Sequence, residues 1–238
     1  MLLSIIIPAY NEERRIGATL ASIASYLKKK DFDAEVIVVN NRSKDKTADV
    51  VKSFDPDFQH LRLLNENHAG KGYAVRKGML EGRGKYRLFM DADNSTTIDH
   101  FEKMLPYLAE DEYDVVIGSL AVKGAKVVRG EPFWRVLLGK LGNKWIQIWA
   151  VWGISDTQRG FKVFTARAAD HIFENVTIFG WGFDIEVLAL ARKFGYKIKE
   201  VGVRWDNDPD SKVNIWAYPQ VLMQTVKVRW NLVTGAYD

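Results

Sequence analysis

Two aspartates separated by one residue are the clearest candidates for chemistry in this chain. Asp91 and Asp93 follow Leu88-Phe89-Met90, which has the composition of a buried strand. Two carboxylates at the end of a strand can bind a hard divalent cation, Mg²⁺ or Mn²⁺, and hold it against a diphosphate. The same tripeptide also suits a turn followed by a helix N-cap, so by itself it does not separate the two interpretations.

Three other polar segments follow runs of β-branched residues that predict strands. They are residues 8–13, the pair Asn40 and Asn41, and Gly70-Lys71-Gly72. A Lys at an exposed helix N-terminus suits a phosphate, although an ordinary turn before a helix can have this sequence too. Ligands of parallel sheets bind beyond the carboxyl ends of the strands, so we expect these segments to share one site.

The elements that must position these residues alternate along the chain. Apolar runs predict buried strands at residues 3–8, 36–39, 61–64, 86–90, 115–118, 161–165 and 197–203. Amphipathic patterns predict helices at about 45–53, 73–80, 99–108 and 183–193, and a first helix bearing Ile16, Leu20, Ile23 and Leu27. Asn11 is its predicted N-cap, with Glu12 and Glu13 in its first turn. This order predicts an α/β fold, a mainly parallel sheet with helices on both faces, in one domain over residues 1–238.

Composition excludes several classes of protein. The chain has 34 Lys and Arg against 30 Asp and Glu, is 47% hydrophobic and contains no Cys. Disulfide frameworks, thiolate catalysis and Cys-ligated zinc are therefore excluded. No apolar run reaches the ~18 residues of a membrane span, and the amino terminus lacks the pattern of a signal peptide. We expect a cytoplasmic protein.

The segment 121–152 combines basic residues with a stripe of large apolar ones. Its six basic residues accompany a single acid, and large apolar residues recur at helical spacing: Trp134, Leu138, Leu141, Trp145, Ile148 or Trp149, and Trp152. This pattern fits a helix docked on a membrane surface and equally a helix packed on the sheet. Residues 216–230, with Trp216 and Trp230, are a candidate companion. The sequence pI of about 9.1 raises a nucleic-acid-binding module as an alternative, but no such motif is present, and we expect no nucleic-acid partner.

Taken together, the motifs resemble those of a known family. The segments SIIIPAYNEE (4–13), NNRSKDKT (40–47), GKG (70–72) and DAD (91–93) are similar to family-two glycosyltransferases of the Rossmann-like GT-A fold, which bind nucleotide sugars. The segments SDTQRGFKVF (155–164), WGFDIEV (181–187), VRW (203–205) and SKV (211–213) look like dolichyl-phosphate β-glucosyltransferases and the related dolichyl-phosphate mannose synthases. The glucosyltransferase pattern is the nearer one.

The resemblance implies a role for each matching residue. It implies that residues 1–119 bind the nucleotide sugar, and that residues 120–238 bind the acceptor and face the membrane with a basic amphipathic helical element. The implied donor-site residues are Pro8, Ala9, Tyr10, Glu12, Asn41, Lys71, Asp91, Ala92 and Asp93, with a divalent cation on Asp91 and Asp93. The residues implied to bind the acceptor phosphate are Arg129, Arg135, Arg159 and Lys162. Those implied to serve catalysis are Asp93, Asp184, Arg135 and Gln158.

Two positions depart from the family pattern. Asn40 and Asn41 stand where the family usually has two aspartates, and an amide can accept a base N–H but carries no charge. Gly118-Ser119 is followed by Leu120, where the family commonly has an Arg that faces the acceptor phosphate. We therefore expect modest nucleotide affinity, and either a larger share of phosphate binding by Arg129 or Arg135 or a different acceptor.

The resemblance implies inverting transfer of a hexose, most directly glucose from UDP-glucose, to a dolichyl or polyprenyl phosphate at the cytoplasmic face of a membrane. A phosphate monoester is largely dianionic at neutral pH and needs no strong base, so Asp184 is expected to orient the acceptor or the sugar. The enzyme would be peripheral, held by its own surface or by a membrane-anchoring subunit. Two other enzymes are alternatives, one that transfers mannose from GDP-mannose and one that transfers to a glycan hydroxyl. A third alternative is a nonenzymatic partner-binding subunit, but the presence of Asp91, Asp93 and Gly160 argues against it.

Overall fold

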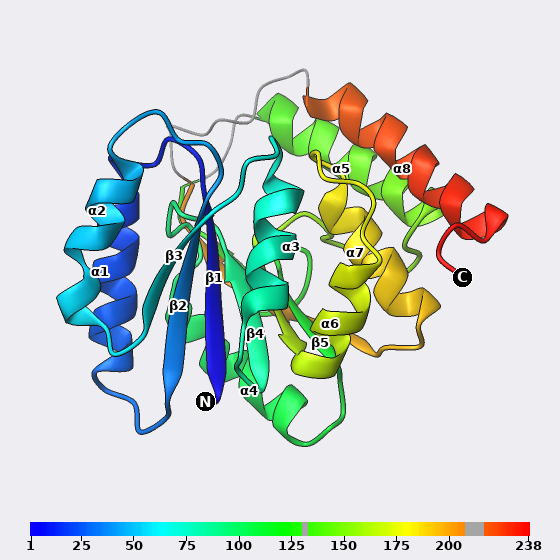
Figure 1. Cartoon of the computed structure of the whole chain (residues 1–238). Helices are drawn as coiled ribbons and strands as arrows, with labels where there is room; N and C mark the ends of the chain where they lie inside the picture. Colours follow the sequence, from blue (N-terminus) through cyan, green and yellow to red (C-terminus); the bar gives the residue numbers. More distant parts are fainter. Residues whose placement is uncertain (130–132, 208–216) are drawn as a thin grey trace.

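The computed structural model describes residues 1–129, 133–207 and 217–238, and a seven-stranded sheet forms its centre (Figure 1). The strand order is β3-β2-β1-β4-β7-β5-β8. The strands are β1 (Leu3–Ala9), β2 (Ala34–Asn40), β3 (Leu61–Asn65), β4 (Tyr86–Met90), β5 (Val115–Ser119), β7 (Phe161–Thr165) and β8 (Ile198–Gly202). All neighbours are parallel except β7, which runs antiparallel to both β4 and β5. The predicted mainly parallel sheet is confirmed.

Helices cover both faces of this sheet, as predicted. One face carries α1 (Ile16–Leu27), α2 (Thr47–Ser53) and α4 (Phe101–Ala109), and the other carries α3 (Lys71–Glu81), α6 (Ala166–Glu174) and α7 (Phe183–Lys193). Alternate side chains of a strand point to opposite faces, so Ile5 and Ile7 pack with α1 while Ile6 packs with α3. Strands buried on both faces read as continuous apolar runs, which explains why they were visible in the sequence.

Two longer helices lie side by side beyond the sheet (Figure 1). They are α5 (Phe133–Trp149) and α8 (Ala217–Thr234), which pack on each other, and α8 also packs on α7. Among the residues that the structure describes, every helix is too short or too polar to cross a bilayer. The short elements are the 3₁₀ turns η1 (Asp55–Asp57) and η2 (Ile98–His100) and a ribbon of β6 (Lys126–Val127) with β9 (Arg204–Trp205).

The predicted start of the first helix is wrong. α1 begins at Ile16 after Arg15, and Asn11 lies in a loop with a positive φ of 52°. The polar groups of this loop form hydrogen bonds with the segment that follows β2. The Asn11 Oδ1 accepts from the Lys44 N–H, and the Glu12 N–H donates to the Thr47 hydroxyl. Long-range partners in the segment after β2 thus compete successfully with local helix capping.

Candidate functional site

A cavity of about 610 Å³, lined by several charged side chains, lies at the carboxyl edge of the sheet, where β1, β2 and β4 end. We call it the sheet-edge cavity. Its lining includes all nine residues predicted for the donor site, namely Pro8, Ala9, Tyr10, Glu12, Asn41, Lys71, Asp91, Ala92 and Asp93. Arg15, Arg42, Lys44 and Trp181 add to it. The sheet therefore brings together segments that lie up to 173 residues apart in the chain, from Pro8 to Trp181.

The two aspartates of the motif sit in different surroundings. Asp91 forms an ion pair with Lys71, Nζ to Oδ1 2.6 Å, while the Asp93 Oδ1 accepts from the Ser95 N–H at 2.9 Å. Burial raises the pKa of the Asp93 carboxyl, and the negative charge of Asp91 raises it further. A cation between the two carboxylates would relieve this repulsion, so the pair fits a hard divalent ion.

The chain supplies only part of a coordination shell here. Among the described residues no three His, Asp or Glu side chains form a metal-binding cluster. Mg²⁺ and similar ions are commonly held by one or two carboxylates together with substrate phosphates and water. The two aspartates suit an ion that arrives with a diphosphate, rather than one enclosed by protein ligands.

Gly160 makes room for the motif. Its carbonyl accepts from the Asp91 N–H at 3.1 Å, and a Cβ at this position would overlap the Asp91 carboxylate. Because β7 is antiparallel, its amino end meets the carboxyl end of β4, with Phe161 paired to Met90. The antiparallel strand is the reason that residues 156–160 reach the site.

Lys71 lies at the start of α3 and connects the acidic groups of the site. Burial by itself would lower the pKa of its ammonium, but the charges of Asp91, Asp184 and Asp93 raise that pKa above the usual value. The ammonium therefore stays charged, which suits contact with a phosphate. Glycine is needed on both sides of Lys71: Gly70 before it has a φ of 140°, and a Cβ on Gly72, in the first turn of α3, would lie 2.7 Å from the Phe179 Cα.

Asn41 lines the cavity, yet its amide already has partners in the chain. Its Nδ2 donates to the His68 carbonyl at 2.6 Å, and its Oδ1 accepts from the Gly70 N–H at 3.1 Å. The side chain thus holds the loop that leads into α3. Its predicted contact with a nucleotide base stays a prediction, and the structure adds this positioning role.

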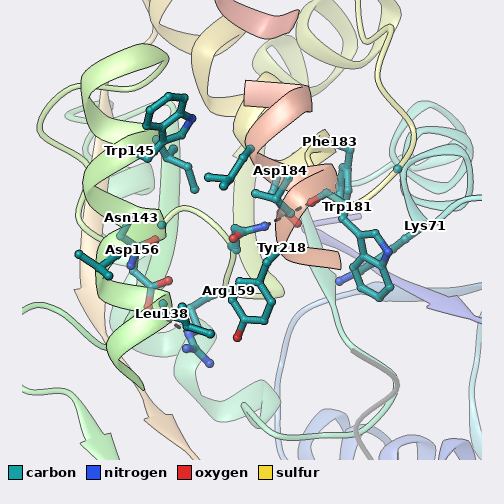
Figure 2. A pocket seen from close by; sticks show the side chains of 18 of the residues that line it. Lys71, Leu138, Asn143, Trp145, Asp156, Arg159, Trp181, Phe183, Asp184 and Tyr218 are labelled. Carbon is teal, nitrogen blue, oxygen red and sulfur yellow. Dashed lines mark hydrogen bonds and ion pairs between the residues drawn. The ribbon is translucent and has the colours of Figure 1, made fainter. Parts of the chain in front are cut away.

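A second cavity, of about 520 Å³, shares lining residues with the first, and Figure 2 shows the side chains around it. We call it the helix-pair cavity because α5 and α8 form its apolar wall through Leu138, Leu141, Trp145, Ile146, Val221 and Leu222. Its polar wall consists of Lys71, Asp91, Asp156, Gln158, Arg159 and Asp184. Lys71, Asp91, Gly180 and Trp181 line both cavities, so a ligand in one would meet a ligand in the other beside Asp91.

Lys162 has a different place from the one predicted. It lies within β7, is completely buried, and donates from Nζ to the Asp184 Oδ1 at 2.5 Å and to the Arg159 carbonyl. Burial lowers the pKa of this ammonium and raises that of the Asp184 carboxyl, while their mutual attraction opposes both shifts. Direct contact with an acceptor phosphate is incorrect, because the strand directs the side chain inward onto Asp184.

The other predicted basic residues separate into two groups. Arg159 lines the helix-pair cavity, where its Nε donates to the Asp156 Oδ2 at 3.0 Å and its guanidinium stacks over the Trp205 ring. The neighbouring Gln158 donates to the Trp181 carbonyl at 3.3 Å. Arg129 follows β6, pairs with Asp206 and lines neither of the two cavities, and its assignment to the acceptor phosphate stays a prediction. The side chain of Arg135 and the residues Trp216 and 211–213 lie outside the described part of the chain.

Sequence reasoning missed the supports of the site. Gln224 of α8 accepts from the Gly182 N–H at 2.6 Å, and Glu186 accepts from the Tyr237 hydroxyl at 2.6 Å and from Thr177. Burial raises the pKa of the Glu186 carboxyl. These bonds fix the segment that carries Trp181 onto the carboxyl-terminal helix. These supporting residues can be identified only from their spatial arrangement, whereas Trp181 and Asp156 belong to motifs that the sequence itself shows.

A sheet of this order, with paired aspartates in a cavity at its carboxyl edge, has the GT-A fold of glycosyltransferases. The chain belongs to glycosyl transferase family 2, whose family model matches residues 4–173.

Dolichyl-phosphate beta-glucosyltransferases of several organisms align with most of this chain. A dolichyl-phosphate beta-glucosyltransferase of Trichomonas vaginalis is 37% identical over 94% of this chain and 69% of its own length. Those of Drosophila melanogaster and Homo sapiens are 35% and 33% identical over 99% of this chain and 76% and 77% of their own lengths.

Solved structures agree on the fold. Glucosyl-3-phosphoglycerate synthase of Mycobacterium tuberculosis, in complex with phosphoglyceric acid, has a TM-score of 0.71 at 17% identity over 96% of this chain and 79% of that one. Its complex with Mn²⁺, UDP-glucose and phosphoglyceric acid has a TM-score of 0.68 at 15% identity, over 97% of this chain and 79% of that one. At these identities the likeness establishes the fold alone.

Proposed function

We infer that this glycosyltransferase moves glucose from UDP-glucose to dolichyl phosphate or another polyprenyl phosphate, with inversion at the anomeric carbon. The observation that carries the proposal is the junction of the two cavities at Asp91 and Lys71. One cavity contains the paired aspartates and suits a nucleotide diphosphate with its metal ion, while the other has Lys71 and Arg159 on one wall and the apolar helices α5 and α8 on another. A polyprenyl phosphate matches this second cavity, because it has an anionic phosphate at one end and an apolar isoprenoid chain at the other. The names of the relatives and the UDP-glucose complex of the structural neighbour support this choice.

The residues divide the work between donor and acceptor. A divalent cation on Asp91 and Asp93 would neutralise the charge that develops on the departing diphosphate. Lys71 supplies a fixed positive charge at the junction, where that diphosphate and the acceptor phosphate meet. Arg159, oriented by Asp156, offers its remaining N–H groups to the acceptor phosphate. The acceptor oxygen then attacks the anomeric carbon from the helix-pair cavity, opposite the leaving group.

We also propose that the α5–α8 face docks on the cytoplasmic surface of a membrane. Large apolar side chains are exposed on both helices, with Ile148 70%, Met223 68% and Trp230 68% accessible, and Trp152 follows α5 at 72%. The neighbouring exposed cations are Lys140, Lys144, Lys227 and Arg229. Apolar groups with cations at their edge suit an anionic leaflet, and the helix-pair cavity beside them would receive a lipid from it.

The test is transfer by the purified chain to dolichyl phosphate in detergent micelles. Labelled UDP-glucose with Mg²⁺ or Mn²⁺ should give label that extracts into organic solvent, and EDTA should abolish it. Asp93→Asn should lower the rate by about a hundredfold or more, because a bound metal contributes several kcal/mol at the leaving group. The matched control Asp49→Asn, at an exposed position on α2, should leave the rate unchanged.

Labelled GDP-mannose and a glycan acceptor serve as the competing substrates. Faster transfer from GDP-mannose would replace the glucose donor in the proposal, and transfer to the glycan but not to the lipid phosphate would refute the acceptor. Tighter binding of UDP than of GDP, measured by thermal stabilisation with metal present, is the accompanying expectation.

A further inference from the structure

Each carboxylate on the wall of the helix-pair cavity is already paired with a cation. Asp91, Asp156 and Asp184 are the acids among the described residues that line it, and no described histidine does so. Asp91 is 2.6 Å from the Lys71 ammonium, Asp156 is 3.0 Å from the Arg159 Nε, and Asp184 is 2.5 Å from the Lys162 ammonium. The cavity therefore presents charges that are matched within the protein.

The pair of Asp184 with Lys162 differs from the other two in being fully enclosed. Lys162 is 0% exposed near the start of β7, and Asp184 is 4% exposed in the first turn of α7. Lys71 and Arg159 reach the cavity itself and can turn toward a ligand, whereas Lys162 is absent from the cavity wall. The contact of Lys162 with Asp184 thus persists whatever occupies the cavity.

This permanence matters for the chemistry at Asp184. A hydroxyl or a water molecule becomes a nucleophile only when a base removes its proton, and a carboxylate facing the acceptor cavity has the right position for that task. A cation in contact with a carboxylate stabilises its charged form and weakens it as a base. An acceptor that arrives as an anion needs no such base.

We propose that Lys162 keeps Asp184 from acting as a general base, so that the site glycosylates acceptors that are already anionic and protects the donor from hydrolysis. The proposal rests on the proposed function and deepens it, because it names the residue that makes the site reject alcohols and water in favour of a phosphate monoester. Lys162 touches neither substrate and acts through Asp184, as a positioning residue. Asp184 keeps its negative charge toward the sugar and accepts hydrogen bonds there.

Removal of Lys162 should release the suppressed reaction. A water proton would pass to the Asp184 carboxylate, the water oxygen would bond to the anomeric carbon, and the bond from that carbon to the diphosphate oxygen would break. Glucose and UDP would be the products, with no lipid glucoside. Hydrolysis without an acceptor is therefore the readout, since a purely structural role for Lys162 would lower hydrolysis and transfer together.

The experiment compares Lys162→Met with the double variant Lys162→Met, Asp184→Asn. In Lys162→Met the ratio of UDP-glucose hydrolysis to glucosyl transfer should rise about tenfold or more, within the range of a general base. The double variant should return the ratio to that of the native chain. Arg87→Met is the matched control, because it removes a buried cation from the ion pair with Asp170, which lines neither cavity. An unchanged ratio in folded Lys162→Met overturns the proposal.

A measurement on the native chain decides the matter if Lys162→Met does not fold. The chain is offered citronellyl phosphate and citronellol, which share one hydrocarbon and differ in the nucleophile. Transfer to the phosphate alone, with hydrolysis that Asp184→Asn does not lower, supports the proposal. Transfer to the alcohol at a comparable rate, or hydrolysis that requires Asp184, overturns the proposal and leaves the proposed function intact. Transfer to neither acceptor overturns both.

Discussion

At the scale of single residues, Gly160 shows how closely two strands meet at the reacting centre. A Cβ there would fall within the Asp91 carboxylate, so any larger residue must move either the aspartate or the backbone before β7. Asp91 also pairs with Lys71 and lines both cavities. A small change at Gly160 therefore acts on the metal pair and on the junction of donor and acceptor.

We predict that Gly160→Ala lowers the transfer rate by about tenfold or more, since small displacements of positioning groups are costly to catalysis. The free energy of unfolding should fall by about 1–3 kcal/mol, as is usual for overpacking. Gly17→Ala on α1 is the control, because its Cβ would find ordinary contacts at 3.6 Å and alanine favours a helix. Kinetics and urea unfolding measure both effects. Native activity in Gly160→Ala would contradict the assignment of Asp91.

At the scale of elements, α5 serves two surfaces at once. Ile146 is buried in the core, Leu138 and Trp145 line the helix-pair cavity, and Ile148 with Trp149 is exposed. A core helix and a docking helix are therefore compatible interpretations of α5, because its apolar stripe includes side chains that the core does not bury. The docking role stays a prediction.

We predict that the chain cosediments with anionic liposomes at low salt and that salt weakens the binding. Ile148→Ser with Trp149→Ala should reduce binding by about tenfold or more, because each buried CH₂ adds ~0.8 kcal/mol to membrane affinity. Neither residue lines a described cavity, so nucleotide affinity should not change. Val127→Ser, which removes an exposed apolar side chain from β6, is the control. If the native chain does not bind liposomes, a membrane-anchoring partner must bring it to its lipid.

At the scale of the whole molecule, the carboxyl terminus holds the site together. Glu186 at the start of α7 is fully buried and accepts from the Tyr237 hydroxyl, from Thr177 and from the Ile178 N–H. This network joins the last residues of the chain to the segment before Trp181. Burial raises the pKa of Glu186, so its contribution to stability is present at low pH and decreases as the pH rises through that raised value.

We predict that Tyr237→Phe lowers the free energy of unfolding by about 1–3 kcal/mol, because it removes a donor from a buried carboxylate. Without the hydroxyl the pKa of Glu186 should rise further, so the loss should be larger at pH 8 than at pH 5. Urea unfolding at the two pH values measures this difference. Tyr196→Phe, at a partly exposed hydroxyl that contacts His171, is the control. An equal loss at both pH values would contradict the role of Glu186.

The sequence by itself determined the positions along the chain of the seven strands of the central sheet and of most helices between them, the mainly parallel character of the sheet and the donor edge. These follow from local signals: continuous apolar runs mark strands buried on both faces, and polar segments directly after them must gather at the carboxyl edge. That reasoning placed the nine predicted donor residues in one cavity. It failed at Asn11, where partners beyond Arg42 replaced the helix cap.

Only the tertiary structure decided which charges meet. The sequence identified the strand at 161–165 but not its antiparallel insertion between β4 and β5, because an apolar run has the same pattern in either direction. That insertion sets Gly160 against Asp91 and directs Lys162 onto Asp184, 22 residues away. Side-chain pairs of this kind depend on strand register and direction, which long-range packing chooses, and so they could not be read from spacing along the chain.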